Sequence, residues 1–157
     1  MRERLLQELP WFVKSVSKVP GVRKISILGS ITTDKEDPKD IDFLVMVEDT
    51  AHLEPLARLG RKLSGHAQQF GHGGDVFLSD TQGTYIGRTC HWRDCGPGIR
   101  VSCDALNCGQ RHYLHDDLKA VTLTAETVRN AMELWPHLES CSGLPSDLEK
   151  VLRELEK

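Results

Sequence analysis

The stretch from Ile25 to Val47 carries a Gly-Ser pair and two aspartates whose types and spacing could do chemistry. Side chains alternate between the two faces of a strand, so Asp40 and Asp42 are expected on one side, about 7 Å apart. Two carboxylates at this spacing can bracket a hard divalent cation. Gly29-Ser30 ends the preceding apolar run and offers backbone N–H groups and a hydroxyl to a phosphate. The pattern favours a metal-dependent site for a nucleoside triphosphate; the alternative is a turn that feeds a strand with solvated aspartates.

The surrounding pattern predicts the elements that position these residues. Strands are expected over Val22–Leu28 and Ile41–Val47, and the second is apolar on both faces, which is typical of a central strand. An amphipathic helix is expected from Leu53 to about Gly65, followed by a third strand over Asp75–Leu78. This order predicts an α/β (α+β) fold with a small mixed sheet backed by helices.

The combination of Gly29-Ser30, nine residues and Asp40-x-Asp42 inside an apolar run resembles the signature of the nucleotidyltransferase superfamily, the DNA polymerase β-like fold, in its minimal form. The resemblance covers about residues 20–80. It implies a third carboxylate after the intervening helix, where Asp75 stands. It also implies that Asp40, Asp42 and Asp75 are catalytic and hold Mg²⁺ in a two-metal site, while Gly29 and Ser30 bind the triphosphate.

The resemblance implies transfer of a nucleoside monophosphate from an NTP, expected to be ATP, to a hydroxyl on a protein, an RNA or a small molecule. The chain departs from many minimal members, which carry an arginine shortly after Gly-Ser, because Ile31–Asp34 stands there instead. A second hypothesis is therefore a catalytically weak or inactive module of the same fold that binds RNA or a protein partner. Retained partner binding without Asp40 and Asp42 would favour this second hypothesis.

A cysteine-rich segment follows the third predicted strand. Four thiols fall in two evenly spaced pairs, Cys90 with Cys95 and Cys103 with Cys108. Such a set predicts a structural zinc site, in which a nearby histidine (His91, His112 or His115) could replace one cysteine. The alternative is a set of buried or incidental thiols.

The same segment is rich in arginine. At least one of Arg88, Arg93, Arg100 and Arg111 is expected to face the carboxylate site and to offset the missing arginine after Ser30. The run from His112 to Asp117 is interpreted mainly as a solvated loop with a helix cap.

Helices are also expected at both ends of the chain. Near the N-terminus, Pro10 must kink a helix or lie in the first turn of a second one. Thr124 is expected to cap a helix that carries Val128, Met132 and Trp135, and Ser146 to open a last helix whose leucine stripe contacts the core. The predicted division is a core over 1–80, a Cys/His-rich segment over 81–117 and C-terminal helices over 118–157.

Composition narrows the class of protein. The chain has 157 residues, 39% of them hydrophobic and 27% charged, which is typical of a globular domain. A net charge of −3 argues against broad non-specific nucleic-acid binding. No apolar run approaches the roughly 18 residues of a membrane span, and the charged N-terminus does not resemble a signal peptide, so a cytoplasmic location without membrane contact is expected.

Overall fold

The structure is a computed structural model that describes residues 2–91, 105, 111–116, 118, 122–138 and 144–155. Its strands are β1 (Val22–Leu28), β2 (Asp40–Val47), β3 (Gly73–Ser79), β4 (Tyr85–Thr89), β5 (Leu114–His115) and β6 (Met132–Trp135). Its helices are α1 (Arg2–Leu6), α2 (Glu8–Val16), α3 (Glu54–Gln68), α4 (Ala125–Asn130) and α5 (Ser146–Leu155), with a 3₁₀ turn, η1, over Ser30–Thr32.

The described strands form one sheet in the order β5-β4-β3-β2-β1-β6. β2 and β3 run parallel, because the long helix α3 connects them, and the other neighbours pair antiparallel. β2 lies inside the sheet between β1 and β3, as its two apolar faces indicated. The expected mixed sheet backed by helices is confirmed.

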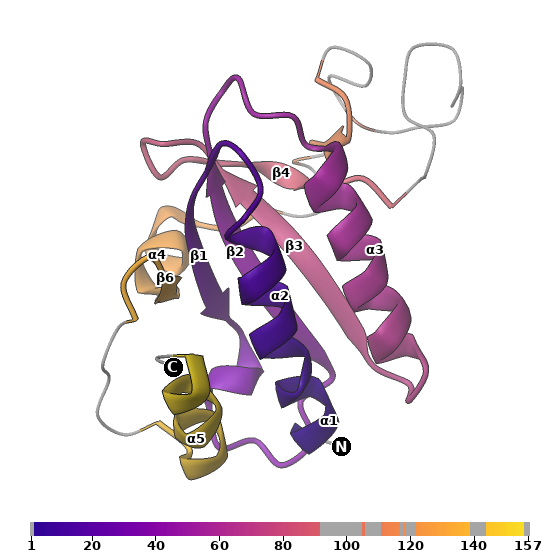
Figure 1. The fold of residues 1–157 in the computed structure, drawn as a ribbon, viewed down its shortest axis with the longest axis vertical. Helices are drawn as coiled ribbons and strands as arrows, with labels where there is room; N and C mark the ends of the chain where they lie inside the picture. Colours follow the sequence, from indigo (N-terminus) through magenta and orange to yellow (C-terminus); the bar gives the residue numbers. More distant parts are fainter. Residues whose placement is uncertain are drawn as a thin grey trace.

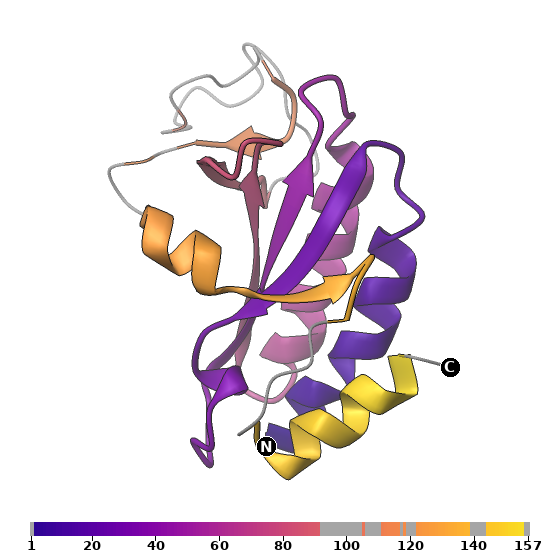
Figure 2. The same cartoon turned by 90° about the vertical axis from the view of Figure 1, so that its left-hand side faces the viewer.

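Helices α2 and α3 cover one face of the sheet, while α4 lies over the opposite face (Figures 1 and 2). The helix-covered face holds the main core, where side chains such as Phe43, Val45 and Leu78 are fully buried. We call the opposite side the open face. A smaller apolar cluster lies there, built on Leu44 and Phe77 and closed by residues of and around α4. No helix in the described part of the chain is long and apolar enough to cross a membrane.

The two terminal regions were partly predicted. The N-terminal pattern divides into α1 and α2, and Pro10 is the third residue of α2, within the first turn, where its missing N–H costs nothing. In α5 the buried Leu148 and Leu152 pack into the main core, so the expected core contact of this stripe is confirmed.

The expected helix after Thr124 is wrong in its second half. Thr124 does cap α4, since its hydroxyl accepts the Thr127 N–H at 3.1 Å, but the helix ends at Asn130. The chain then extends as β6, in which Met132 and Leu134 are buried against β1. The spacing of Met132 fitted a helix, but its alternation with Leu134 fits a strand equally well, and the unpaired edge of β1 decides between them.

We expect Leu134→Ala to lower the free energy of unfolding by about 2–4 kcal/mol, because a core side chain that is 4% exposed leaves a cavity. Had the helix continued, Leu134 would have lain off its apolar stripe. Urea unfolding measures the change, with Glu126→Ala on the exposed side of α4 as the control. A cost below about 0.5 kcal/mol, typical of surface substitutions, would contradict the strand.

The described part of the segment over 81–117 contains two strands, β4 and β5. β4 follows β3 through a hairpin turn in which the Asp80 carboxylate accepts the N–H groups of Gln82 and Thr84. β5 then pairs with β4, and Leu114 and Asp116 are buried, so the solvated-loop interpretation of the run from His112 is wrong for the described residues. Asp117 lies outside them. The three-part division of the chain stays a prediction.

Candidate carboxylate site

The three predicted aspartates lie on the open face at one end of the sheet. Asp40 and Asp42 are two residues apart on β2 and share a face. The parallel register pairs Asp42 directly with Asp75 on β3, and Asp40 with Gly73. The structure therefore brings together three residues from two strands that are well separated in the sequence. Asp40 is exposed, while Asp42 and Asp75 are partly buried.

Asp42 is the electrostatic centre of this group. The pKa of Asp42 is raised from 3.8 to about 7. Burial is the largest cause, and the nearby charges of Asp75 and Asp40 also raise it. One contact works in the other direction, because the Asp75 N–H donates to the Asp42 carboxylate at 3.1 Å. The carboxylates therefore repel one another at neutral pH, and a cation between them would relieve that repulsion.

The Gly-Ser turn lies beside this group. Gly29 ends β1 with φ +89°, a conformation that side chains rarely adopt, and a Cβ there would lie 3.7 Å from the Asp42 carboxylate. η1 follows immediately, and the backbone carbonyls of Gly29 and Ser30 accept the N–H groups of Thr32 and Thr33. The turn thus brings the backbone of Gly29 next to the Asp42 carboxylate.

Two basic side chains approach the third carboxylate: Arg88, which is charged, and His91, whose pKa is lowered by burial so that its imidazole is mostly neutral at neutral pH. Arg88 Nη1 lies 3.9 Å from Asp75 Oδ1, and His91 Nε2 lies 3.7 Å from the same atom. Arg88 is thus the arginine that meets the expectation of a positive charge at the site. Arg111 instead donates to the Glu48 carbonyl at 2.9 Å, near the other end of β2.

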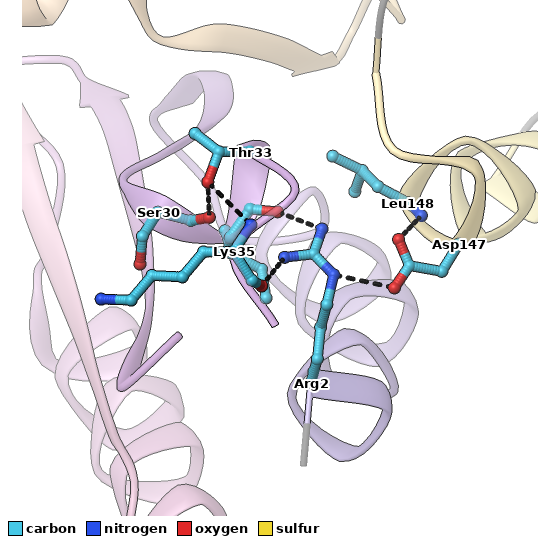
Figure 3. Close-up of polar contacts among 7 residues, drawn as sticks. Arg2, Ser30, Thr33, Lys35, Asp147 and Leu148 are labelled. Atoms are coloured by element: carbon cyan, nitrogen blue, oxygen red, sulfur yellow. Dashed lines mark hydrogen bonds and ion pairs between the residues drawn. The ribbon is translucent and has the colours of Figure 1, made fainter. Parts of the chain in front are cut away.

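A buried arginine that no local sequence pattern indicates holds the turn in place. Arg2 donates to the carbonyls of Ile31 at 2.7 Å and Lys35 at 3.1 Å, and its Nε lies 2.7 Å from the Asp147 carboxylate (Figure 3). It therefore joins α1, the loop after Ser30 and α5. Burial raises the pKa of Asp147, but the hydrogen bonds from Arg2 and the Leu148 N–H outweigh it and leave the pKa below the usual value.

We expect Arg2→Ala to lower the free energy of unfolding by about 2–3 kcal/mol, because two loop carbonyls and one carboxylate lose a charged donor together. The matched control is Arg153→Ala, which removes an exposed pair with Glu149 and should cost about 0.5 kcal/mol or less. Denaturant unfolding compares the two. Equal small costs would show that Arg2 does not hold these segments together.

The chemistry of the carboxylates suits a hard cation, although their present contacts are directed elsewhere. In the described part of the chain, no three His, Cys, Asp or Glu side chains form a group that could hold a metal ion as they stand. Asp42 accepts the Asp75 N–H, and Asp75 is turned toward Arg88 and His91. Metal binding by Asp40, Asp42 and Asp75 would therefore need side-chain rotation.

The zinc hypothesis falls mostly on residues that the structure does not describe. Cys90 is buried at the end of β4, but Cys95, Cys103 and Cys108 lie outside the described residues, as do Arg93 and Arg100. The zinc site stays a prediction.

Comparison with known proteins gives one match. Residues 1–95 match a family described as "Family of unknown function (DUF6932)". No curated protein and no solved structure matches the chain. The matched residues include η1, β2 and β3, and therefore Gly29, Ser30 and the three aspartates.

Proposed function

The chain belongs to DUF6932, a family of unknown function, and we propose from the site itself that it is a Mg²⁺-dependent nucleotidyltransferase. The observation that carries the proposal is the pairing of Asp42 with Asp75 across β2 and β3, with Asp40 on the same face and Gly29 alongside. A helix between the strand of Asp40 and Asp42 and the strand of the third carboxylate is also what the resemblance to the nucleotidyltransferase superfamily implies.

The proposed reaction moves a nucleoside monophosphate from an NTP, which we expect to be ATP, to a hydroxyl acceptor. The acceptor oxygen bonds to the α-phosphorus, the bond from this phosphorus to the bridging oxygen of the β-phosphate breaks, and pyrophosphate leaves. In this reaction Asp75 would receive the hydroxyl proton directly or through water. The backbone of Gly29 and Ser30 positions the triphosphate.

Asp40, Asp42 and Asp75 are the residues that would hold Mg²⁺, which supplies charge neutralisation for the triphosphate and the leaving group. The raised pKa of Asp42 supports this assignment, because the repulsion among the carboxylates ends when a cation is shared. A cytoplasmic location fits NTP chemistry and stays part of the proposal.

One observation favours the second hypothesis, a binding module without catalysis. Arg88 lies 3.9 Å from Asp75 and supplies positive charge from the protein itself, which weakens the need for a metal. In that case the cysteine-rich segment would bind RNA or a protein partner, and the aspartates would contribute only to stability.

Incubation with α-³²P-labelled NTPs, Mg²⁺ or Mn²⁺ and a cell lysate tests the proposal. The expected result is a labelled acceptor that needs both the metal and Asp42. A protein that labels nothing, yet captures the same partner with or without Asp40 and Asp42, would support the binding module instead.

A further inference from the structure

A cavity of about 660 Å³ lies on the open face, next to the carboxylates but separate from them. We call it the open-face cavity. Its floor comes from β1, β2 and β3, one wall from the β3–β4 turn, and the other from α4 and the residues just before it. Figure 2 shows α4 standing over this face of the sheet. The volume is in the range of sites that hold small molecules.

The floor of the cavity contains two serines. Ser26 is 2% exposed and Ser79 is 1% exposed, and both line the cavity. A serine hydroxyl can donate one hydrogen bond and accept others, so this floor suits an occupant that brings its own polar groups.

The walls are apolar and the rim is basic. Leu44, Met46, Tyr85 and Val128 line the cavity, and the exposed Leu118 stands at its edge. Lys24 and Arg129 also line it, and neither forms an ion pair with the described residues.

No acidic side chain of the described residues lines the cavity. In a chain of net charge −3, a cavity with two cations and no carboxylate is complementary to an anion.

The cavity opens toward the carboxylate site along the strands. Leu44 follows Asp42 by two residues on the same face, so the floor begins about 7 Å from that carboxylate. Lys24 pairs with Met46 and lies about 13 Å away, four residues along the strand. Tyr85 lies between the cavity and the carboxylate site. It lines the cavity, and the charge of Asp75 adds to burial in raising the pKa of its hydroxyl. A molecule that fills the cavity therefore ends beside the carboxylates.

We propose that the open-face cavity binds a small organic anion that carries hydroxyl groups and a flat or apolar body. Its anionic group would meet Lys24 and Arg129, its body would pack on Leu44 and Tyr85, and its hydroxyls would bond to Ser26 and Ser79. A further step rests on the proposed function: this molecule is the acceptor, whose far hydroxyl reaches the α-phosphorus of the NTP.

AMP is a suitable probe, because it combines a phosphate, ribose hydroxyls and a flat ring. Calorimetric titration in EDTA keeps the metal out of the carboxylate site. Adenosine lacks the anion, so it measures the contribution of the phosphate group. Glucose 6-phosphate lacks the flat ring, so it distinguishes a sugar phosphate from a nucleotide as the source of the phosphate. The expected result is that AMP or glucose 6-phosphate saturates one site and that adenosine binds at least about tenfold more weakly than AMP.

The variants locate that binding. Arg129→Glu changes an exposed side chain and Ser79→Leu fills the floor, and each should raise the Kd of the bound phosphate compound by about tenfold or more. Lys18→Glu, an exposed charge reversal outside the cavity, should leave the Kd unchanged, and Asp42→Asn should bind at least as tightly as wild type. Thermal unfolding confirms that each variant is folded.

The proposal is overturned if neither phosphate compound binds, or if Arg129→Glu leaves the Kd unchanged. Loss of binding in Asp42→Asn would also overturn it, because the probe would then occupy the carboxylate site. Cavity-specific binding together with no transfer from labelled NTPs would leave the cavity in place and reject the nucleotidyltransferase. The two claims can therefore fail separately.

Discussion

Asp42→Asn is expected to abolish nucleotidyl transfer, with a loss of at least about 10³-fold in rate at saturating NTP and Mg²⁺. Asp42 lies at the centre of the carboxylate group, between Asp40 on its own strand and Asp75 on the neighbouring one. Asparagine keeps the oxygen that accepts the Asp75 N–H, so the fold is retained and only the charge and the metal ligand are lost. Transfer of labelled phosphate measures the effect.

The control for this variant is Asp49→Asn, the same change at an exposed aspartate just after β2. It should transfer at the wild-type rate. If Asp42→Asn also transfers within about threefold of the wild-type rate, Asp42 is not a metal ligand. That result would count against the proposed carboxylate site.

The second large effect concerns stability and pH in metal-free protein. The pKa of Asp42 is about 7 in the folded chain against 3.8 for an unperturbed carboxyl group. Below pH 3.8 both folded and unfolded chains hold the proton, and Asp42 costs nothing. Between pH 3.8 and about pH 7 the unfolded chain has lost the proton that the folded chain still holds, so the free energy of unfolding falls as pH rises. Above about pH 7 both are ionised and the cost stays constant.

We therefore expect Asp42→Asn to be more stable than wild type at pH 8, by on the order of 2–4 kcal/mol, and close to wild type at pH 4. Urea unfolding in EDTA across this range measures the difference. Mg²⁺ should reduce it at pH 8, because the cation stabilises the folded wild type and has less to bind in the variant. A difference that stays constant with pH would mean that the charge of Asp42 is already compensated in the folded protein.

The central elements could be predicted because their signals are local. Alternation over Ile25–Ile27 marks β1, a continuous apolar run after Asp42 marks β2, and the apolar spacing marks α3. The relative position of Asp40 and Asp42 follows from the period of two of a strand. Asp75 required one more step, the parallel return of the chain after a helix, and the resemblance to a known family supplied it.

The missed elements depend on neighbours that are distant in sequence. β4 contains Gly87 with φ +139°, where a Cβ would lie 2.7 Å from the His115 carbonyl, so the glycine that weakens the strand signal is there to let β5 approach. Arg2 finds its partners in Ile31, Lys35 and Asp147, and nothing in the local pattern around Arg2 indicates any of them.

The open-face cavity was unpredictable for a similar reason. It exists only because α4 and the β3–β4 turn stand over the sheet, and Ser26 and Ser79 read in sequence as ordinary polar residues of two strands. Their place on the floor of a cavity emerges only when the strands and α4 are assembled.

Titration of a non-hydrolysable ATP analogue into wild type and Asp42→Asn, each with Mg²⁺ and with EDTA, tests the central claim most directly. The carboxylate site predicts saturable binding by wild type in Mg²⁺, weakened at least about tenfold by EDTA and to a similar extent by the substitution. Binding that ignores both the metal and Asp42, or no binding under any condition, would contradict a metal-dependent nucleotide site at these aspartates.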